Sequence, residues 1–210
     1  MHSIHSRVST MSKIDRRSVV AGLAALGGIG AAAPAMAAIS TAQATQLVNQ
    51  VVSEINGAIN SGRSEGAILS QFEVIFQRYA AVEMISQGIL RTEWRSASTQ
   101  QKRAFSNALK VYLARKYGRR FKEFAGGNIE VQSTRDSRRG YEVISQANLR
   151  GQAPFSVMFR VAEIGGQPKF YDIVIEGISL GLVEREEIGA MLDQRRGNLN
   201  QLIADLPQAA

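Results

Sequence analysis

The sequence predicts an α+β fold in which N-terminal helices pack on a roughly four-stranded antiparallel sheet and C-terminal helices follow. Three observations predict it. Apolar residues recur with the 3.6-residue period of helices from residue 40 to 124, and with the 2-residue period of strands from 129 to 176. Gly126 and Gly127 mark the change. After residue 183 the helical period returns, so the order is helices, sheet, helices.

Four helices are expected before the sheet. The first begins at Ser40, where Gln43 completes a capping box. The second and third are expected at residues 68–79 and 82–90. The fourth begins with a second capping box at Ser98. One side of the fourth helix carries seven large apolar or aromatic residues, namely Phe105, Leu109, Tyr112, Leu113, Tyr117, Phe121 and Phe124.

The sheet is expected as four strands, at residues 129–133, 141–150, 155–161 and 171–176. Apolar and polar residues alternate in the last three strands, which directs one face of each toward a core. Short turns separate the strands, so they pair as hairpins. A last helix is expected at 183–196, ended by Gly197, and Asn198 begins a short final helix.

Residues 1–37 have the three parts of a bacterial signal peptide. Arg16 and Arg17 precede a weakly apolar stretch, and an A-x-A cleavage site ends at Ala37. The adjacent arginines favour the twin-arginine route, with the general secretory route as the alternative. About 15 weakly apolar residues are too few to span a bilayer, which needs about 20. We therefore expect one exported domain at residues 38–210, located in the periplasm.

Cleavage would change the chemistry of the chain. Both histidines, His2 and His5, leave with the leader, and the chain contains no cysteine. The net charge falls from +7 to +4, because four basic residues and one acidic residue are lost. A transition-metal site has little support without these ligands. The basic stretch at 115–122 fits a solvated helix face, or contact with anionic lipid or a membrane-bound partner, so no nucleic-acid partner is expected.

The segment from Gly177 to Gly181 has the G-x-S-x-G spacing of a hydrolase nucleophile elbow, with Ser179 in the nucleophile position. A serine nucleophile needs a neighbouring base, usually a histidine, and the mature chain has none. We expect the glycines to bend the backbone where the strand leaves the sheet, and Ser179 either to hydrogen-bond locally or to cap the segment after it. The carboxylates of Glu184, Glu186 and Glu187 are expected at a solvated helix start.

Two surfaces that are expected to face each other carry an excess of aromatic and aliphatic side chains. The first belongs to the fourth helix, and the second to the sheet. The sheet contributes Val143, Phe155, Val157, Phe159, Val161, Tyr171, Ile173 and Ile175. By composition alone an ordinary filled core explains these residues better than a ligand cavity, since cores outnumber pockets.

Two segments of the chain resemble the MlaC family of periplasmic phospholipid-binding proteins, also called the toluene-tolerance family. In residues 78–121 the resemblance consists of a Gly and Leu before a Trp, a capped helix start and one helix face: Gly88, Leu90, Trp94, Ser98, Gln101, Phe105, Leu109, Leu113 and Tyr117. In residues 170–192 it consists of a closing strand, a turn and an arginine: Asp172, Glu176, Gly177, Ser179 and Arg185. The ordered set covers residues 45–206.

The resemblance implies a deep apolar pocket between sheet and helices that holds acyl chains, with bound phospholipid as the ligand. It implies no catalytic residue, no metal and no other cofactor. On this basis the predicted lipid-binding residues are Phe105, Leu109, Tyr112, Leu113, Tyr117, Val143, Val157, Phe159, Val161, Tyr171, Ile173 and Ile175.

The resemblance also implies shuttling between an outer-membrane lipoprotein–porin complex and an inner-membrane ABC transporter that carries MCE-domain proteins. Leaving a lipid with about 30 methylenes in water would cost roughly 24 kcal/mol, at about 0.8 kcal/mol per CH₂. A carrier therefore needs a closed apolar pocket and no catalytic group. Three alternatives remain open: a carrier of hopanoids or other lipids, a lipid-free adaptor of an envelope complex, and an enzyme that uses Ser179 or a carboxylate pair.

Overall fold

The computed structural model describes residues 39–119 and 126–210. The predicted signal peptide at 1–37 and the predicted helical residues Phe121 and Phe124 lie outside these ranges. Within them, no helix is both long enough and apolar enough to cross a membrane.

Five helices precede the sheet and two follow it, within the described ranges. The helices are α1 (Thr41–Ile59), α2 (Glu65–Tyr79), α3 (Val82–Leu90), α4 (Thr92–Ser96), α5 (Thr99–Gly118), α6 (Leu180–Gln194) and α7 (Leu199–Asp205). A 3₁₀ turn, η2 (Leu206–Gln208), follows α7. The strands are β1 (Asn128–Ser137), β2 (Gly140–Asn148), β3 (Phe155–Ile164), β4 (Gln167–Ile175) and β5 (Ile178–Ser179). The predicted α+β class is confirmed.

The helix starts follow the predicted capping chemistry. At α1, the Ser40 hydroxyl accepts a hydrogen bond from the Gln43 amide, and the Gln43 side chain accepts one from the Ser40 amide. Ser98 begins α5 with the same reciprocal pair. Asn198 caps α7 through its own side chain, which accepts from the Gln201 amide. The short helix α4 was not predicted, and α6 begins at Leu180, three residues earlier than expected.

The sheet is an antiparallel meander in the order β1-β2-β3-β4-β5. The fifth strand has only two residues and was not predicted. It forms because Glu176 and Gly177 both adopt positive φ, 49° and 81°, and so make a two-residue hairpin in which Ile175 pairs with Ile178. The meander confirms the predicted hairpin connections and adds one short strand to the predicted four.

A β-bulge in β4 changes the side-chain alternation that the sequence predicted. Tyr171 is an extra residue between Phe170, which pairs with Val161, and Asp172, which pairs with Arg160. One extra residue shifts every preceding side chain to the other face of the sheet. Phe170 therefore takes the inward position that strict alternation gives to Tyr171, and it is only 3% exposed.

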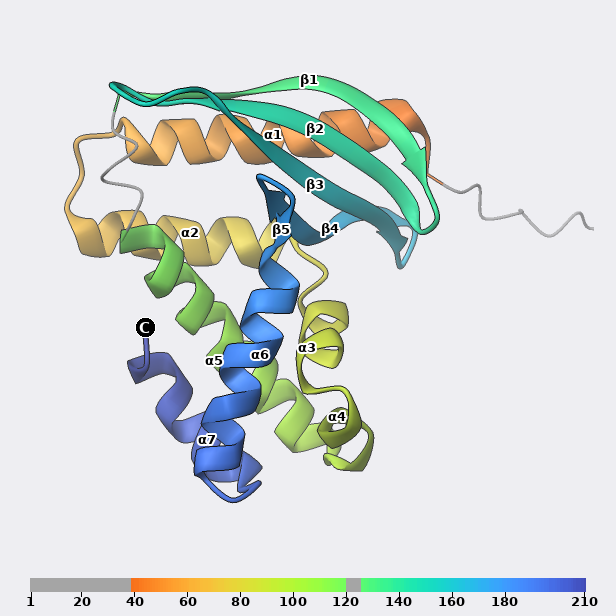
Figure 1. Ribbon diagram of the computed structural model, residues 1–210, viewed down its shortest axis with the longest axis vertical. Helices are drawn as coiled ribbons and strands as arrows, with labels where there is room; N and C mark the ends of the chain where they lie inside the picture. Colours follow the sequence, from red (N-terminus) through yellow and green to blue (C-terminus); the bar gives the residue numbers. More distant parts are fainter. Residues whose placement is uncertain (1–38, 120–125) are drawn as a thin grey trace, which may run out of the picture. The chain divides into compact units, whose positions relative to one another are not determined.

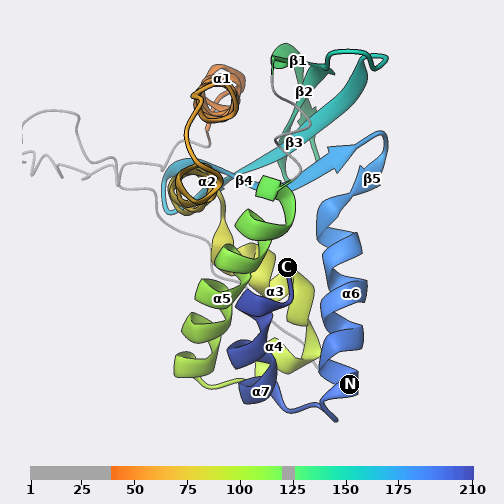
Figure 2. The same ribbon diagram turned by 90° about the vertical axis from the view of Figure 1, so that its left-hand side faces the viewer.

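The helices lie in two groups relative to the sheet. Figures 1 and 2 show α1 along one face of the sheet and α2 next to α1, while α3, α5, α6 and α7 are grouped on the far side of α2. The apolar residues accordingly form two clusters. Phe76 and Ile85 pack against both of them.

We call the cluster between the sheet, α1 and α2 the sheet core. Its buried members include Val48, Val51, Ile55, Phe72, Ile75, Val143, Phe159, Val161 and Phe170. We call the cluster among α3, α4, α5, α6 and α7 the helical core. Its buried members include Ile89, Trp94, Phe105, Leu109, Tyr112, Ile188, Leu192, Leu202 and Leu206.

Candidate functional site

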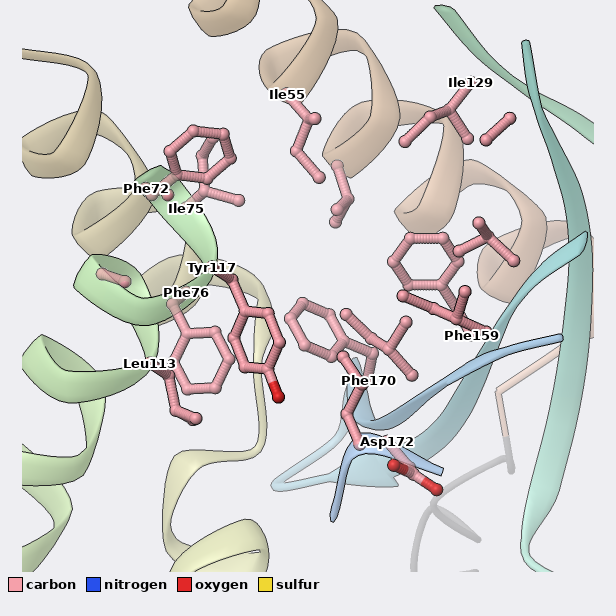
Figure 3. Close-up of a pocket in the computed structure, with 18 of the residues that line it drawn as sticks. Ile55, Phe72, Ile75, Phe76, Leu113, Tyr117, Ile129, Phe159, Phe170 and Asp172 are labelled. Carbon is pink, nitrogen blue, oxygen red and sulfur yellow. The ribbon is translucent and has the colours of Figure 1, made fainter. Parts of the chain in front are cut away.

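A cavity of about 500 Å³ lies between the sheet and helices α1, α2, α3, α5 and α6 (Figure 3). This volume is within the usual range of ligand pockets, about 300–1,000 Å³. Most of its wall is aliphatic or aromatic. The apolar lining includes Val51, Ile55, Ile59, Phe72, Ile75, Phe76, Leu113, Tyr117, Ile129, Val157, Phe159, Phe170, Ile173, Ile175 and Ile178.

Three phenylalanines from three elements form part of this wall. The Phe170 ring of β4 meets Phe76 of α2 edge to face at a centroid distance of 5.7 Å, and Phe159 of β3 at 6.0 Å. Such contacts fix the rings against one another. Tyr117 also lines this cavity, and Figure 3 shows its side chain together with Phe76 and Phe170. The wall is therefore built from side chains that support each other.

One end of the cavity lies at the β4–β5 hairpin. Ile178 lines the cavity and is nevertheless 60% exposed, so it marks an opening to solvent. Leu182 and Val183, in the first turn of α6, are also exposed. The hairpin is held in place by Glu176, whose carboxylate accepts a hydrogen bond from the Ser156 amide.

The structure places seven of the twelve predicted site residues around the cavity. They are Leu113, Tyr117, Val157, Phe159, Tyr171, Ile173 and Ile175. They come from α5, β3 and β4, and the structure brings them together from positions about 60 residues apart in the chain. Their contact with a ligand stays a prediction.

The other five predicted residues lie in the two packed clusters and do not line the cavity. Phe105, Leu109 and Tyr112 belong to the helical core, and Val143 and Val161 to the sheet core. Phe105, Leu109 and Tyr112 lie away from the cavity because α5 is long. Its early turns pass among α3, α6 and α7, and only its last turns reach the cavity. The two valines are covered by the apolar side chains of the sheet core, in which α1 takes part.

Sequence reasoning did not assign the contributions of α1 and α2 to the site. Val51, Ile55, Phe72 and Ile75 line the cavity and lie on helix faces whose apolar period is visible in the sequence. The period identifies a buried face, but it does not distinguish a face that meets a cavity from one that meets packed side chains. Phe170 was missed because the bulge in β4 reverses the expected alternation.

The residues of the closing motif connect α6 to its neighbours. The Asp172 carboxylate accepts hydrogen bonds from the Ser179 hydroxyl at 2.7 Å, the Gly181 amide at 3.1 Å and Arg160 at 3.0 Å. Ser179 in turn accepts one from the Leu182 amide and so caps α6. Arg185 donates to a backbone carbonyl of α3. Ser179 thus caps the helix that follows it, which is one of the two roles expected from the sequence.

The prediction that Glu184 lies at a solvated helix start is wrong, because the residue is buried. Its side chain lies in the wall of the cavity, and the residue is 1% exposed. Lys116 donates to Glu184 Oε1 at 2.8 Å, to the Tyr112 hydroxyl at 3.1 Å and to Glu187. The Tyr117 hydroxyl also donates to Glu184, and the Tyr112 hydroxyl to Glu187. These five side chains form one network, which joins α5 to α6 and which we call the polar cluster.

The protonation of the polar cluster follows from its burial and its pairing. Burial, reinforced by the carboxylates of Glu184 and Glu187, raises the pKa of both Tyr112 and Tyr117 far above their ordinary values. Burial alone would lower the pKa of Lys116, but the two carboxylates outweigh it and the pKa is raised. The hydrogen bond from Lys116 lowers the pKa of Glu187. At neutral pH the lysine is therefore charged and both tyrosines are neutral.

The acidic side chains do not assemble into a metal site in the part of the chain that the structure describes. No group of three or more carboxylates or histidines within residues 39–119 and 126–210 has the arrangement to hold a metal ion. The Glu184 and Glu187 carboxylates are paired with the Lys116 ammonium instead.

The fold and the cavity define the class: an α+β protein with an apolar chamber between an antiparallel sheet and its helices. A family model described as MlaC protein matches residues 45–208, and the chain belongs to this family. Comparison with curated proteins yields no match.

A similar solved structure is that of the phospholipid-binding protein from Ralstonia solanacearum in complex with a phospholipid. It superposes with a TM-score of 0.65 at 20% sequence identity, over 78% of this chain and 98% of that chain. The likeness supports the fold described above.

Proposed function

We propose that this protein is a periplasmic phospholipid carrier that holds acyl chains in the apolar cavity and the polar head group at the opening. The observation that carries the proposal is the cavity of about 500 Å³ with an almost wholly apolar wall. Membership of the MlaC family and the phospholipid in the Ralstonia structure support the same ligand class.

The physical reason for such a carrier is the water between two membranes. Each methylene left in water costs about 0.8 kcal/mol, so a free two-chain lipid would face a barrier of tens of kcal/mol. Burying the chains against side chains such as Phe159 and Ile173 removes most of that barrier. The process is binding and release, and it needs no group that makes or breaks a covalent bond.

For the cellular role we propose movement of phospholipid between the outer and inner membranes, as the soluble component of an ABC transport system. The partners would be an outer-membrane lipoprotein–porin complex and an inner-membrane transporter with MCE-domain proteins. Delivery to the periplasm would use the signal peptide predicted at residues 1–37. A hopanoid or another lipid is the alternative ligand, and a lipid-free adaptor is the alternative role.

A vesicle transfer assay tests the carrier function. The mature protein, residues 38–210, is mixed with donor vesicles that contain a labelled phospholipid, and the lipid that leaves with the protein is measured after the vesicles are removed. We expect uptake of lipid by the wild-type protein and a loss of at least tenfold for Ile173→Asp, because a buried carboxylate is poorly accommodated among acyl chains.

Two controls make this assay decisive. Ser179→Ala should keep lipid uptake nearly intact, because the hydroxyl acts as a helix cap. Glu186→Gln changes an exposed side chain on α6 and should behave as the wild type. No uptake by a folded wild-type protein would contradict the carrier proposal and favour the adaptor. An esterase activity lost in Ser179→Ala would favour the enzyme.

A further inference from the structure

The wall of the cavity contains one buried polar atom that the protein leaves without a partner among the described residues. Glu184 Oε1 accepts hydrogen bonds from Lys116 and Tyr117. Glu184 Oε2 is fully buried and accepts no hydrogen bond from residues 39–119 or 126–210. A buried carboxylate oxygen without a donor is unfavourable, and such groups are uncommon in folded proteins.

The other carboxylates that line the cavity differ from Glu184. Both oxygens of Asp172 accept hydrogen bonds, from Arg160, the Ser179 hydroxyl and the Gly181 amide. Glu176 is exposed at the hairpin and accepts from the Ser156 amide. Glu184 is therefore the lining carboxylate that is both buried and only half paired.

The hydrogen-bond inventory of the polar cluster decides what kind of group would satisfy Oε2. Lys116 has three ammonium protons, and all three point to acceptors within the cluster. The hydroxyl protons of Tyr112 and Tyr117 are donated to carboxylates. The cluster has no donor left for a phosphate oxygen, and its open position is an acceptor. The missing partner is therefore a hydrogen-bond donor.

The charged groups of the polar cluster indicate which kind of hydrogen-bond donor fits Glu184 Oε2. Two carboxylates, Glu184 and Glu187, face one ammonium, that of Lys116, and the two tyrosines are neutral. Two acidic side chains therefore share one basic side chain in a wall that is otherwise largely apolar. Low polarity around a charge strengthens its attraction for an opposite charge. A donor that is also a cation fits this position better than a neutral hydroxyl.

The position of Glu184 relative to the opening suits a head group. Gly181 and Glu184 both line the cavity and are three residues apart on α6, so they lie on the same side of the helix. One helical turn rises about 5.4 Å. Glu184 therefore lies about one helical turn along α6 from Gly181, near the hairpin end of the cavity where Ile178 is exposed. A short polar group can reach it while the acyl chains occupy the apolar space.

We propose that Glu184 forms a head-group subsite that accepts a hydrogen bond from a primary ammonium, so that the carrier selects aminophospholipids. This inference rests on the proposed lipid-carrier function and names the class of lipid that it prefers. The chemistry requires N–H donors, so a quaternary ammonium does not satisfy it. Phosphatidylethanolamine and phosphatidylcholine with identical acyl chains differ only in the three N-methyl groups that replace the N–H donors, and they give a matched pair of probes.

The test is competitive loading from vesicles that contain equal amounts of the two lipids. The mature protein is incubated with them and separated, and the bound lipids are extracted and counted by mass spectrometry. We expect about tenfold enrichment of phosphatidylethanolamine, since a hydrogen bond to a charged group is worth at least one power of ten in affinity. Glu184→Gln should bring the ratio close to one, and Glu186→Gln, on the exposed side of α6, should keep it.

The outcomes separate this inference from the carrier function. Loading of both lipids in the vesicle proportion by the wild-type protein would overturn the subsite, with Oε2 then satisfied by water, and would leave the carrier function standing. Loading of neither lipid would overturn both. In a third arm, phosphatidylglycerol offers hydroxyl donors without a cation, and its enrichment to the level of phosphatidylethanolamine would overturn the preference for an ammonium. The wild-type ratio decides even if Glu184→Gln fails to fold.

Discussion

The helical core and the cavity are built from the same kinds of side chains, yet one is filled and the other is hollow. Helix α5 takes part in both. Phe105 and Leu109 are fully buried among α3, α6 and α7, whereas Leu113 and Tyr117, closer to the C-terminal end of α5, line the cavity. Figure 2 shows these helices close around the lower part of α5, and the end of α5 near α2 and the sheet.

The helical core and the cavity differ in the element that faces α5. Helices that pack side by side bring their axes to about 8–10 Å, and their side chains interdigitate. A bulge bends its strand and increases the local twist of the sheet, and here β4 has such a bulge at Tyr171. Apolar patterning therefore specifies burial in both regions, while the backbone geometry of the opposing element decides whether the space is filled.

The largest expected effect is that of truncation in the helical core. Phe105→Ala should lower the free energy of unfolding by about 3–5 kcal/mol, because it removes a fully buried ring from a packed cluster. Urea denaturation measures this. Lipid content per folded molecule should stay unchanged, since Phe105 does not line the cavity. A folded variant that has lost its lipid would show that the two regions are not separate.

Overpacking should distinguish the two regions directly. Leu109→Trp adds volume to the filled helical core and should destabilise the protein by about 1–3 kcal/mol. Val157→Trp adds volume beside the cavity and should change the free energy of unfolding by less than about 1 kcal/mol while it displaces lipid. Urea denaturation measures the free energy of unfolding of both variants, and mass spectrometry measures their bound lipid. Equal destabilisation by both substitutions would mean that the cavity is not hollow in solution.

Ser179→Ala should have a smaller effect. Loss of the cap of α6 and of the hydrogen bond to Asp172 should cost about 1 kcal/mol of stability. Lipid binding should change by less than twofold, because Ser179 is not among the residues that line the cavity. Thermal unfolding and the vesicle assay measure the two effects. A large loss of binding at unchanged stability would assign a direct ligand contact to this serine.

The smallest effect concerns alkaline pH and the polar cluster at the boundary of the two regions. Tyr112 and Tyr117 have a raised pKa in the folded protein, so their contribution to stability is complete below their unfolded pKa of about 10 and is lost as the pH rises above it. The raised pKa of Lys116 acts in the same direction.

The free energy of unfolding should therefore fall between about pH 10 and 12, and less steeply in Tyr117→Phe. Denaturant titrations at a series of pH values measure the slope. The control is Tyr141→Phe, which changes a tyrosine outside the polar cluster. An unchanged slope in Tyr117→Phe would contradict the burial of this hydroxyl.

The sequence predicted the elements that local chemistry determines. The capping boxes at Ser40 and Ser98 and the cap at Ser179 could be read directly, because these contacts join residues three positions apart. The order of helices and strands followed from the change of period. The resemblance to the MlaC family was confirmed by the match to residues 45–208.

The features that the sequence did not predict depend on distant partners. The burial of Glu184 requires Lys116, which lies 68 residues earlier in the chain. The inward position of Phe170 requires a bulge against β3, and no residue type in the sequence predicts this bulge. Seven predicted residues line the cavity, but the share of α1 and α2 in its wall became visible only when the helices were placed against the sheet.

The most direct test of the account is native mass spectrometry of the mature protein, expressed in a bacterium and purified without detergent. If the cavity holds acyl chains, the folded protein should carry an added mass equal to one or more phospholipids, and organic extraction should recover the same lipids. Val157→Trp should reduce this added mass while the protein stays folded. A wild-type protein that is folded, consistently free of lipid and unable to take lipid from vesicles would contradict the central claim.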